Sequence, residues 1–124
     1  MVLGVGTDVV NIDRIRPLCD DVSDPFFERV YTPYERRQAM ARPDPAAYFS
    51  TRFAGKEAVF KCLGIDNSDI RLCEIEIIES EGGQPQVNLL GDLKRIAEKK
   101  GFRRFNISLS FESEYALAFA LGQD

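Results

Sequence analysis

The sequence contains no histidine among its 124 residues. This absence excludes the Ser-His-Asp and Cys-His catalytic sets and every metal site that uses an imidazole ligand. Any acid–base chemistry must therefore come from carboxylates, lysines, bound water or a metal ion. Cysteine is scarce as well. Cys19, Cys62 and Cys73 are odd in number and widely spaced, which argues against a disulfide framework and a zinc-binding motif.

Long hydrophobic runs are also missing. No apolar run reaches the roughly 20 residues that a membrane-spanning helix requires, and no basic segment followed by an apolar one marks a signal peptide. We therefore expect no membrane partner and a cytoplasmic location. The chain has 16 lysine and arginine residues against 20 aspartate and glutamate residues, which gives a net charge of −4. This balance argues against nucleic-acid binding, and an acidic partner would have to meet a local basic patch.

The length predicts one domain over residues 1–124, and the hydrophobic periodicity predicts an α+β fold. Strands are expected at 2–8, within 70–80, and at 87–90, 105–110 and 114–121. Helical segments are expected at 11–18, 25–31, 32–41, 45–64 and 91–100. Thr32 and Glu35 have the spacing of a capping box, and Glu112-Ser113 fits a tight turn between the last two strands. We expect an antiparallel sheet of hairpin strands packed against the longest helix.

The helix expected at 45–64 organises the rest of the chain. Pro45 suits the first helical turn, where its missing N–H would be unpaired in any case, and Gly64 suits the left-handed residue that ends a helix. On a helical wheel, apolar residues surround nearly the whole circumference, which is typical of a buried helix. Charged side chains on such a helix need partners, because they are rarely fully buried alone.

Four charged residues of this helix form two sets with a spacing of four residues. Glu57 and Lys61 share one face, and Arg52 and Lys56 share another. The simpler interpretation is a solvated helix edge, at which each pair contributes about 0.2–0.5 kcal/mol. The functional interpretation needs a second acid, which Asp8 supplies at the end of the predicted first strand. Two carboxylates and a lysine suit Mg²⁺ with a phosphate substrate, and the pattern alone leaves both interpretations open.

Two longer motifs add a family resemblance. The segment 4–15 reads GVGTDVVNIDRI and the segment 52–64 reads RFAGKEAVFKCLG, and neither arises easily by chance. Together, and in this order, they resemble holo-acyl-carrier-protein synthases, the small 4′-phosphopantetheinyl transferases. The segment 108–112, SLSFE, is similar to a third motif of that family, so the resemblance covers nearly the whole chain.

The resemblance implies a reaction and a catalytic set. Such enzymes transfer 4′-phosphopantetheine from coenzyme A to a serine of an acyl carrier protein and release adenosine 3′,5′-bisphosphate, as part of fatty acid biosynthesis. Asp8 and Glu57 would bind Mg²⁺, and Lys61 would steady the phosphate and the leaving group. Arg52 and Lys56 would meet cofactor phosphates or hold the helix in place. The acceptor of the serine proton stays open among Glu57, Asp8 and a metal-bound water.

The resemblance also implies where coenzyme A binds. The glycine–proline loop with Gly83 and Pro85 would lie near its adenine end, and the third motif would place Ser108 and Ser110 at the cofactor. Basic residues also gather at and beyond the end of the helix expected at 91–100. They form either a solvated face or a landing site for the phosphates of coenzyme A. These basic residues are Lys94, Arg95, Lys99, Lys100, Arg103 and Arg104.

Contacts between proteins are implied as well. Arg14 would meet acidic residues of the carrier protein, and Arg16 is a second candidate for that contact. The family implies a homotrimer with active sites between subunits. A short chain buries a shallow core, which makes such an assembly reasonable.

Three features depart from the family pattern. Gln84 stands where a basic residue is common, Phe111 stands where many members have histidine, and a glycine-rich turn is missing after Gly64. They motivate one alternative, a non-catalytic module of the same fold that binds coenzyme A or a carrier protein. A second alternative is an interaction protein whose charged pairs are surface features only.

Overall fold

The structure is a computed structural model, and it describes residues 1–66 and 71–124. Strands β1 (Val2–Asn11), β4 (Arg104–Glu112) and β5 (Tyr115–Gln123) form an antiparallel sheet in the order β1-β5-β4. Strands β2 (Ile75–Glu79) and β3 (Pro85–Leu89) form a separate antiparallel hairpin. The predicted α+β fold is confirmed.

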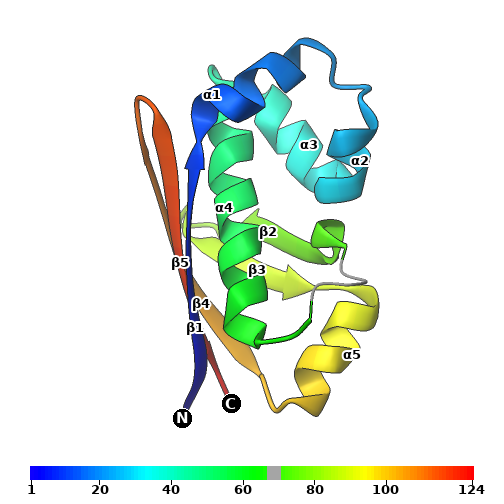
Figure 1. Cartoon of the computed structure of the whole chain (residues 1–124), viewed down its shortest axis with the longest axis vertical. Helices are drawn as coiled ribbons and strands as arrows, with labels where there is room; N and C mark the ends of the chain where they lie inside the picture. Colours follow the sequence, from blue (N-terminus) through cyan, green and yellow to red (C-terminus); the bar gives the residue numbers. More distant parts are fainter. Residues whose placement is uncertain (67–70) are drawn as a thin grey trace.

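The long helix α4 (Pro45–Leu63) lies along one face of the three-stranded sheet, as Figure 1 shows. Its ends are those expected. Asp44 caps the first turn by accepting from the Ala47 N–H, and Gly64 ends the helix with a φ of 63°. Helix α4 is buried over most of its circumference, because the sheet, the hairpin and the N-terminal helices contact it from different sides.

Small residues let this helix approach the sheet closely. A Cβ added at Gly4 would overlap the carbonyl oxygen of Cys62, and a Cβ added at Gly6 would overlap that of Ala58. The residues of β5 that face the helix are mostly alanines, among them Ala118, which is 1% exposed. Backbones that pack this closely hold α4 at one rotation and one height relative to β1.

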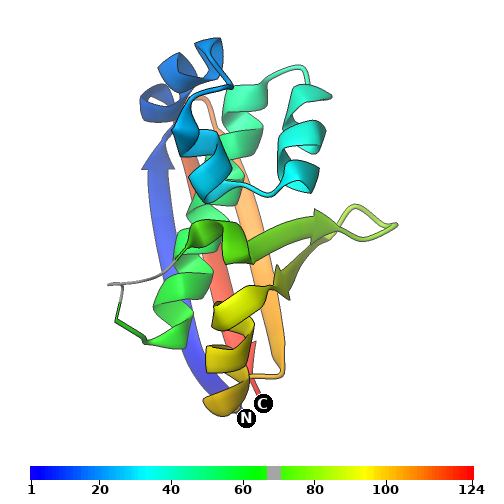
Figure 2. The same ribbon diagram turned by 90° about the vertical axis from the view of Figure 1, so that its right-hand side faces the viewer.

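The remaining helices flank α4. Helices α1 (Ile12–Ile15), α2 (Pro25–Val30) and α3 (Pro33–Met40) cover one end of it, and α5 (Gly91–Lys99) lies near the opposite end (Figures 1 and 2). The expected helix at 11–18 ends at Ile15 and continues as a 3₁₀ segment, Arg16–Asp20, which contains the helix-breaking Pro17. The capping box is confirmed, since Thr32 accepts from the Glu35 N–H and the Glu35 carboxylate accepts from the Thr32 N–H.

Several expected boundaries were wrong. Strand β1 does not end at Asp8 but continues to Asn11, because it stays paired with β5 up to Tyr115. The last turn consists of Ser113 and Glu114, one position later than expected. The strand expected within 70–80 is confirmed as β2, which follows a 3₁₀ turn at Leu72–Glu74. Most of the polar loop expected at 65–69 lies outside the described residues.

The face of the sheet opposite α4 is apolar and open. Alternation along β1 and β5 places five large apolar side chains there, each between 42% and 62% exposed. Among the described residues, no helix or strand covers this face (Figure 1). The five side chains, which we call the open face, are Val5, Val9, Tyr115, Leu117 and Phe119. No helix in the described part of the chain is long and apolar enough to cross a membrane.

We predict that Gly6→Ala destabilises the fold strongly. The added methyl group would overlap the backbone carbonyl of Ala58, which cannot move without displacing α4. The free energy of unfolding, measured by denaturant titration, should fall by more than about 3 kcal/mol. Gly82→Ala is the matched control, because a Cβ at Gly82 would meet no atom within 4 Å. Equal stability of the two variants would contradict the close packing of β1 on α4.

Candidate active site

Two motifs that are far apart in the sequence meet at the edge of the sheet formed by β1. Asp8 projects from β1 toward α4, where the Lys61 ammonium lies 3.2 Å from Asp8 Oδ1. The same ammonium donates to the Thr7 carbonyl at 2.9 Å. Glu57 lies one turn before Lys61 on the same face of α4 and is close enough for its charge to interact with both neighbours. The structure therefore brings Asp8, Glu57 and Lys61 together.

The carboxylate of Glu57 is held in an unfavourable environment. Its pKa is raised, first by partial burial and then by the negative charge of Asp8, while the positive charge of Lys61 opposes the shift. A cation placed between the two carboxylates would relieve this repulsion. Within the described residues, no group of three or more acidic or cysteine side chains could hold a metal ion. Two carboxylates are nevertheless the set that Mg²⁺ commonly takes from a protein, so these residues fit that ion.

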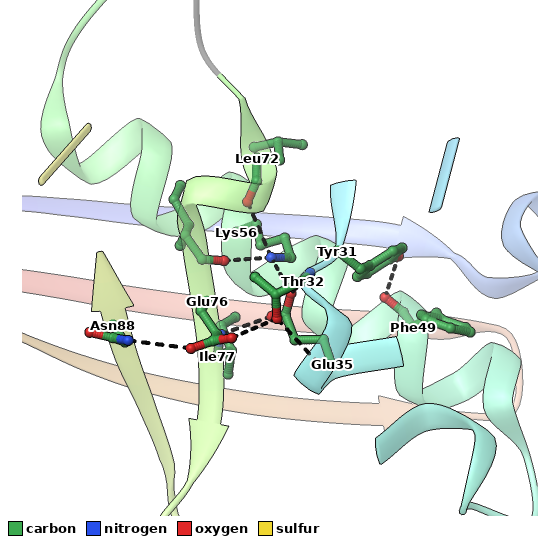
Figure 3. Close-up of polar contacts among 10 residues, drawn as sticks. Tyr31, Thr32, Glu35, Phe49, Lys56, Leu72, Glu76, Ile77 and Asn88 are labelled. Atoms are coloured by element: carbon green, nitrogen blue, oxygen red, sulfur yellow. Dashed lines mark hydrogen bonds and ion pairs between the residues drawn. The ribbon is translucent and has the colours of Figure 1, made fainter. Parts of the chain in front are cut away.

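Lys56 does not reach a cofactor, and its assignment as a cofactor-binding residue was wrong. Its side chain is fully buried on the side of α4 that faces α3 and the hairpin (Figure 3). The ammonium lies 2.7 Å from Glu35 Oε1 and donates to the carbonyls of Leu72 and Ile75. All three donors are therefore used within the protein, and Lys56 has the other role considered, that of holding the helix in place.

Arg52 lies at the base of the hairpin. Its guanidinium donates to Glu79 Oε1 at 2.8 Å and stacks over the ring of Tyr48 at 3.9 Å from the ring centroid. Arg42 donates to the same oxygen of Glu79 at 2.9 Å. Two guanidinium groups thus share one carboxylate. The buried Nε of Arg52 has no hydrogen-bond partner within the described residues.

The turn that carries Gly83 and Pro85 projects from this base, since Glu79 is the residue opposite Pro85 in the hairpin. Gly83 adopts a φ of 81°, which suits a turn that only glycine forms easily. Arg52 therefore lies beside the loop expected at the adenine end of coenzyme A, although its charge is largely occupied by Glu79.

A cavity with a volume of about 740 Å³ lies between β3, β4 and α5. Pro85 and Ser108 line it, whereas Gly83 and Ser110 are not among its lining residues. Three basic side chains of the cluster noted in the sequence border it: Lys94, Arg103 and Arg104. A polar cavity of this size with a basic rim suits a large ligand that carries phosphate groups.

Asp8 and the cavity lie on opposite edges of the three-stranded sheet. Strand β1 forms one edge and β4 forms the other, with β5 between them (Figure 2). Asp8 and its two neighbours on α4 belong to the β1 edge, and Ser108 belongs to the β4 edge. One copy of the chain therefore does not bring all the expected site residues together.

The remaining expected site residues lie near the N-terminal helices. Arg14 is exposed on α1 and forms no ion pair within the described residues. Arg16 is paired with Asp44 at 3.1 Å and lies 3.8 Å from Asp13. Of these two arginines, Arg14 is therefore the one whose charge is available to an acidic partner, as judged from the described residues.

Sequence reasoning missed three residues. Tyr48 and Glu79 organise the two guanidinium groups at the base of the hairpin, and Glu35 was interpreted only as a capping residue. No spacing rule relates Glu35 to Lys56, which lies 21 residues away on another helix. The one available signal was a lysine on a helix that is apolar nearly all round, because such a lysine needs a buried acid.

Comparisons with known proteins identify the family of the chain. The family model of the 4′-phosphopantetheinyl transferase superfamily, labelled ACPS, matches residues 4–120. The holo-[acyl-carrier-protein] synthase of Desulforudis audaxviator is 39% identical over 98% of this chain and 92% of its own. The crystal structure of the synthase from Neisseria meningitidis is 30% identical, covers both chains fully and has a TM-score of 0.89.

A further solved structure is a complex with coenzyme A. It is the ACPS-CoA complex of Chronobacterium ammoniagenes, which is 27% identical, covers 97% of this chain and 96% of its own, and has a TM-score of 0.81. The match of residues 4–120 to the family model and the level of identity to the curated relatives identify the family. The chain belongs to the holo-[acyl-carrier-protein] synthases of the 4′-phosphopantetheinyl transferase superfamily.

Proposed function

We propose that this enzyme transfers 4′-phosphopantetheine from coenzyme A to a serine hydroxyl of an apo acyl carrier protein, with Mg²⁺ as the metal. The observation that supports this most directly is the meeting of Asp8, Glu57 and Lys61 at the β1 edge. Family membership supports the reaction type, and the names and titles of the relatives support coenzyme A and a carrier protein as substrates. The expected cytoplasmic location suits both substrates.

The reaction is a substitution at phosphorus. The serine oxygen forms a bond to the phosphorus that carries the pantetheine arm, and the bond from that phosphorus to the bridging pyrophosphate oxygen breaks. Adenosine 3′,5′-bisphosphate leaves with the electron pair. Positioning and neutralisation of charge account for most of the catalysis in phosphoryl transfer. Mg²⁺, held by Asp8 and Glu57, would supply a Lewis acid for the pyrophosphate oxygens.

The chain's own residues have separate tasks in this scheme. The Lys61 ammonium uses two donors on Asp8 and the Thr7 carbonyl, which leaves a third for a phosphate oxygen or the leaving group. The serine proton needs an acceptor, and the two carboxylates lie next to that position. The pKa of Glu57 is raised in the metal-free protein, and a bound Mg²⁺ would lower it, so the acceptor stays open among Glu57, Asp8 and a metal-bound water.

We propose that coenzyme A lies along the hairpin and the cavity between β3, β4 and α5. The volume of about 740 Å³ and the basic side chains Lys94, Arg103 and Arg104 suit its phosphates. Pro85 and Ser108 line this space, and Arg52 lies at the base of the same hairpin. Arg14 is the proposed contact to the acidic carrier, because it is exposed and unpaired among the described contacts.

We propose a homotrimer in which two neighbouring subunits complete each active site. The carboxylates belong to the β1 edge and the cavity to the β4 edge, so a second copy is needed to bring them together. The open face supplies an apolar surface on the same sheet for contact between copies. A closed ring of identical contacts would place one such site at every interface.

The alternative function is a binding module that lacks catalysis. Phe111 is 61% exposed and offers no proton-transfer group at the position where many relatives have histidine, which motivates this alternative. The complete set of Asp8, Glu57 and Lys61 favours the enzyme. A binding module would not need two neighbouring carboxylates, of which Glu57 has its pKa raised by burial and by the charge of Asp8.

Removing either carboxylate should abolish transfer. We predict that Asp8→Ala and Glu57→Ala keep the fold but lose at least about a hundredfold in turnover, because the metal loses one of its two protein ligands. Intact-mass spectrometry of an apo acyl carrier protein, incubated with coenzyme A and Mg²⁺, measures the product directly. Normal turnover by either variant would rule out the proposed metal site. Coenzyme A binding by the wild type without any mass gain would instead support the binding module.

Glu57→Gln should stabilise the metal-free protein at pH 7. The pKa of Glu57 in the folded state lies above its ordinary value of 4.5, so ionisation of this group opposes folding at neutral pH. As the pH falls through the raised pKa, the wild type binds a proton and the difference in unfolding temperature should vanish. Thermal unfolding in the presence of a chelator, from pH 7 to pH 4, tests this. A difference that does not change with pH would contradict a raised pKa of Glu57 in the folded protein.

Leu117→Asp should dissociate the proposed trimer. Leu117 lies on β5 at the centre of the open face and is 51% exposed, so a charge is tolerated in a free subunit but not between subunits. Sedimentation velocity should show monomers, and transfer activity should be lost with them. Val22→Asp is the matched control, since Val22 is 43% exposed and lies outside this face. A Leu117→Asp variant that remains trimeric would contradict the proposed interface.

A further inference from the structure

A second group of charged residues lies away from Asp8, Glu57 and Lys61. Glu35 of α3 and Lys56 of α4 form an ion pair of 2.7 Å in which both side chains are 0% exposed (Figure 3). Neither side chain can touch a substrate, and the proposed mechanism does not use them. A fully buried ion pair is weak evidence for stability, because desolvation of the two charges offsets their attraction. It therefore needs another explanation.

The ion pair is bonded to the backbone of the hairpin. Lys56 donates to the carbonyl of Ile75, and Glu35 Oε2 accepts from the N–H of Ile77 at 2.8 Å. Both backbone groups lie on the edge of β2 that is not paired with β3. Lys56 also donates to the carbonyl of Leu72 at 3.1 Å, in the 3₁₀ turn before β2. Side chains from α3 and α4 thus make the hydrogen bonds that a further strand would otherwise make with this edge of β2.

Every polar group of this arrangement has a partner. Glu35 Oε1 accepts from the Thr32 N–H at 2.9 Å and from Lys56, while Oε2 accepts from Ile77. The Thr32 hydroxyl donates to Glu76 Oε2 at 2.6 Å, which adds a second link between α3 and β2 (Figure 3). A fully satisfied buried network specifies one geometry, because a shift of any member leaves a buried group unpaired.

The position of the hairpin matters for the cofactor. The hairpin carries Gly83, Pro85 and Glu79, which accepts a hydrogen bond from Arg52. Its strand β3 lines the cavity of about 740 Å³. Apolar contacts between the hairpin and α4, such as that of Ile77 with Gly55, are not directional. The hydrogen bonds of Glu35 and Lys56 are directional, so they set the height of β2 along α4.

We infer that Glu35 and Lys56 are positioning residues for coenzyme A: together they fix the hairpin on α4 and thereby shape the cofactor side of the active site. This inference rests on the proposed placement of coenzyme A along the hairpin. It assigns the pair no part in metal binding. The metal ligands project from the β1 side of α4, whereas Lys56 projects toward α3 and β2.

The double variant Glu35→Met/Lys56→Met is the main test. Removing one partner alone would leave a buried charge unpaired and risks unfolding, whereas removing both charges with similar side-chain volumes is commonly tolerated. The variant loses the directional bonds to Leu72, Ile75 and Ile77 but keeps the buried volume. Tyr31→Phe is the matched control. It removes the buried hydrogen bond from the Tyr31 hydroxyl to the Phe49 carbonyl and leaves the hydrogen bonds of the hairpin unchanged.

Three readouts separate positioning from a merely structural role. We expect the dissociation constant and the KM for coenzyme A to rise on the order of tenfold or more in the double variant, because small misplacements of binding groups carry large costs. Mn²⁺ binding, measured by electron paramagnetic resonance as a probe of the Asp8 and Glu57 site, should remain at the wild-type value. Tyr31→Phe should match the wild type in both measurements. Thermal unfolding checks that each variant is folded at the assay temperature.

Two outcomes would overturn the inference. One is a folded double variant that binds coenzyme A as tightly as the wild type. The other is a parallel loss of Mn²⁺ and coenzyme A binding, which indicates general loosening rather than positioning of the hairpin. Failure of the wild type to bind coenzyme A would be a failure of the proposed function instead, and it is measured first with the wild-type protein alone.

Discussion

The structure depends on the close packing of one long helix against a face of glycine and alanine. At Gly4 and Gly6 of β1, a side chain would overlap the backbone carbonyls of α4. This contact leaves no room for water or for rotation of the helix. Because β1 carries Asp8 and α4 carries Glu57 and Lys61, the same contact that builds the core also sets the distances among the proposed catalytic residues.

The helix α4 uses its charged residues in two opposite ways. Lys56 faces the interior and has every donor satisfied by Glu35 and by backbone carbonyls. Glu57, the next residue in the chain, faces the β1 edge, where burial and Asp8 raise its pKa. A satisfied buried group specifies geometry, whereas an unsatisfied and partly exposed group is available for chemistry. Because the two residues are consecutive, about 100° of rotation around the helix axis separates their side chains.

In the proposed trimer, contacts between subunits would bring the proposed catalytic residues to the cavity. Its β1 edge carries the carboxylates, its β4 edge borders the cavity, and the apolar open face lies between them without a cover from the described residues. These three facts have one common explanation in contacts between copies. In the proposed trimer, the hairpin that Glu35 and Lys56 hold on α4 would belong to the cofactor side of a site that two subunits share.

The sequence by itself determined the fold class, the ends of α4 and the expectation that Asp8, Glu57 and Lys61 lie together, because apolar periodicity, Pro45, Gly64 and two long motifs are local patterns. Only the tertiary structure decided the partners of charged residues. Lys56 was misassigned because its acid, Glu35, lies on a different helix, and the extent of β1 depends on its pairing with β5. Desolvation and pairing across elements are long-range properties, so no local spacing encodes them.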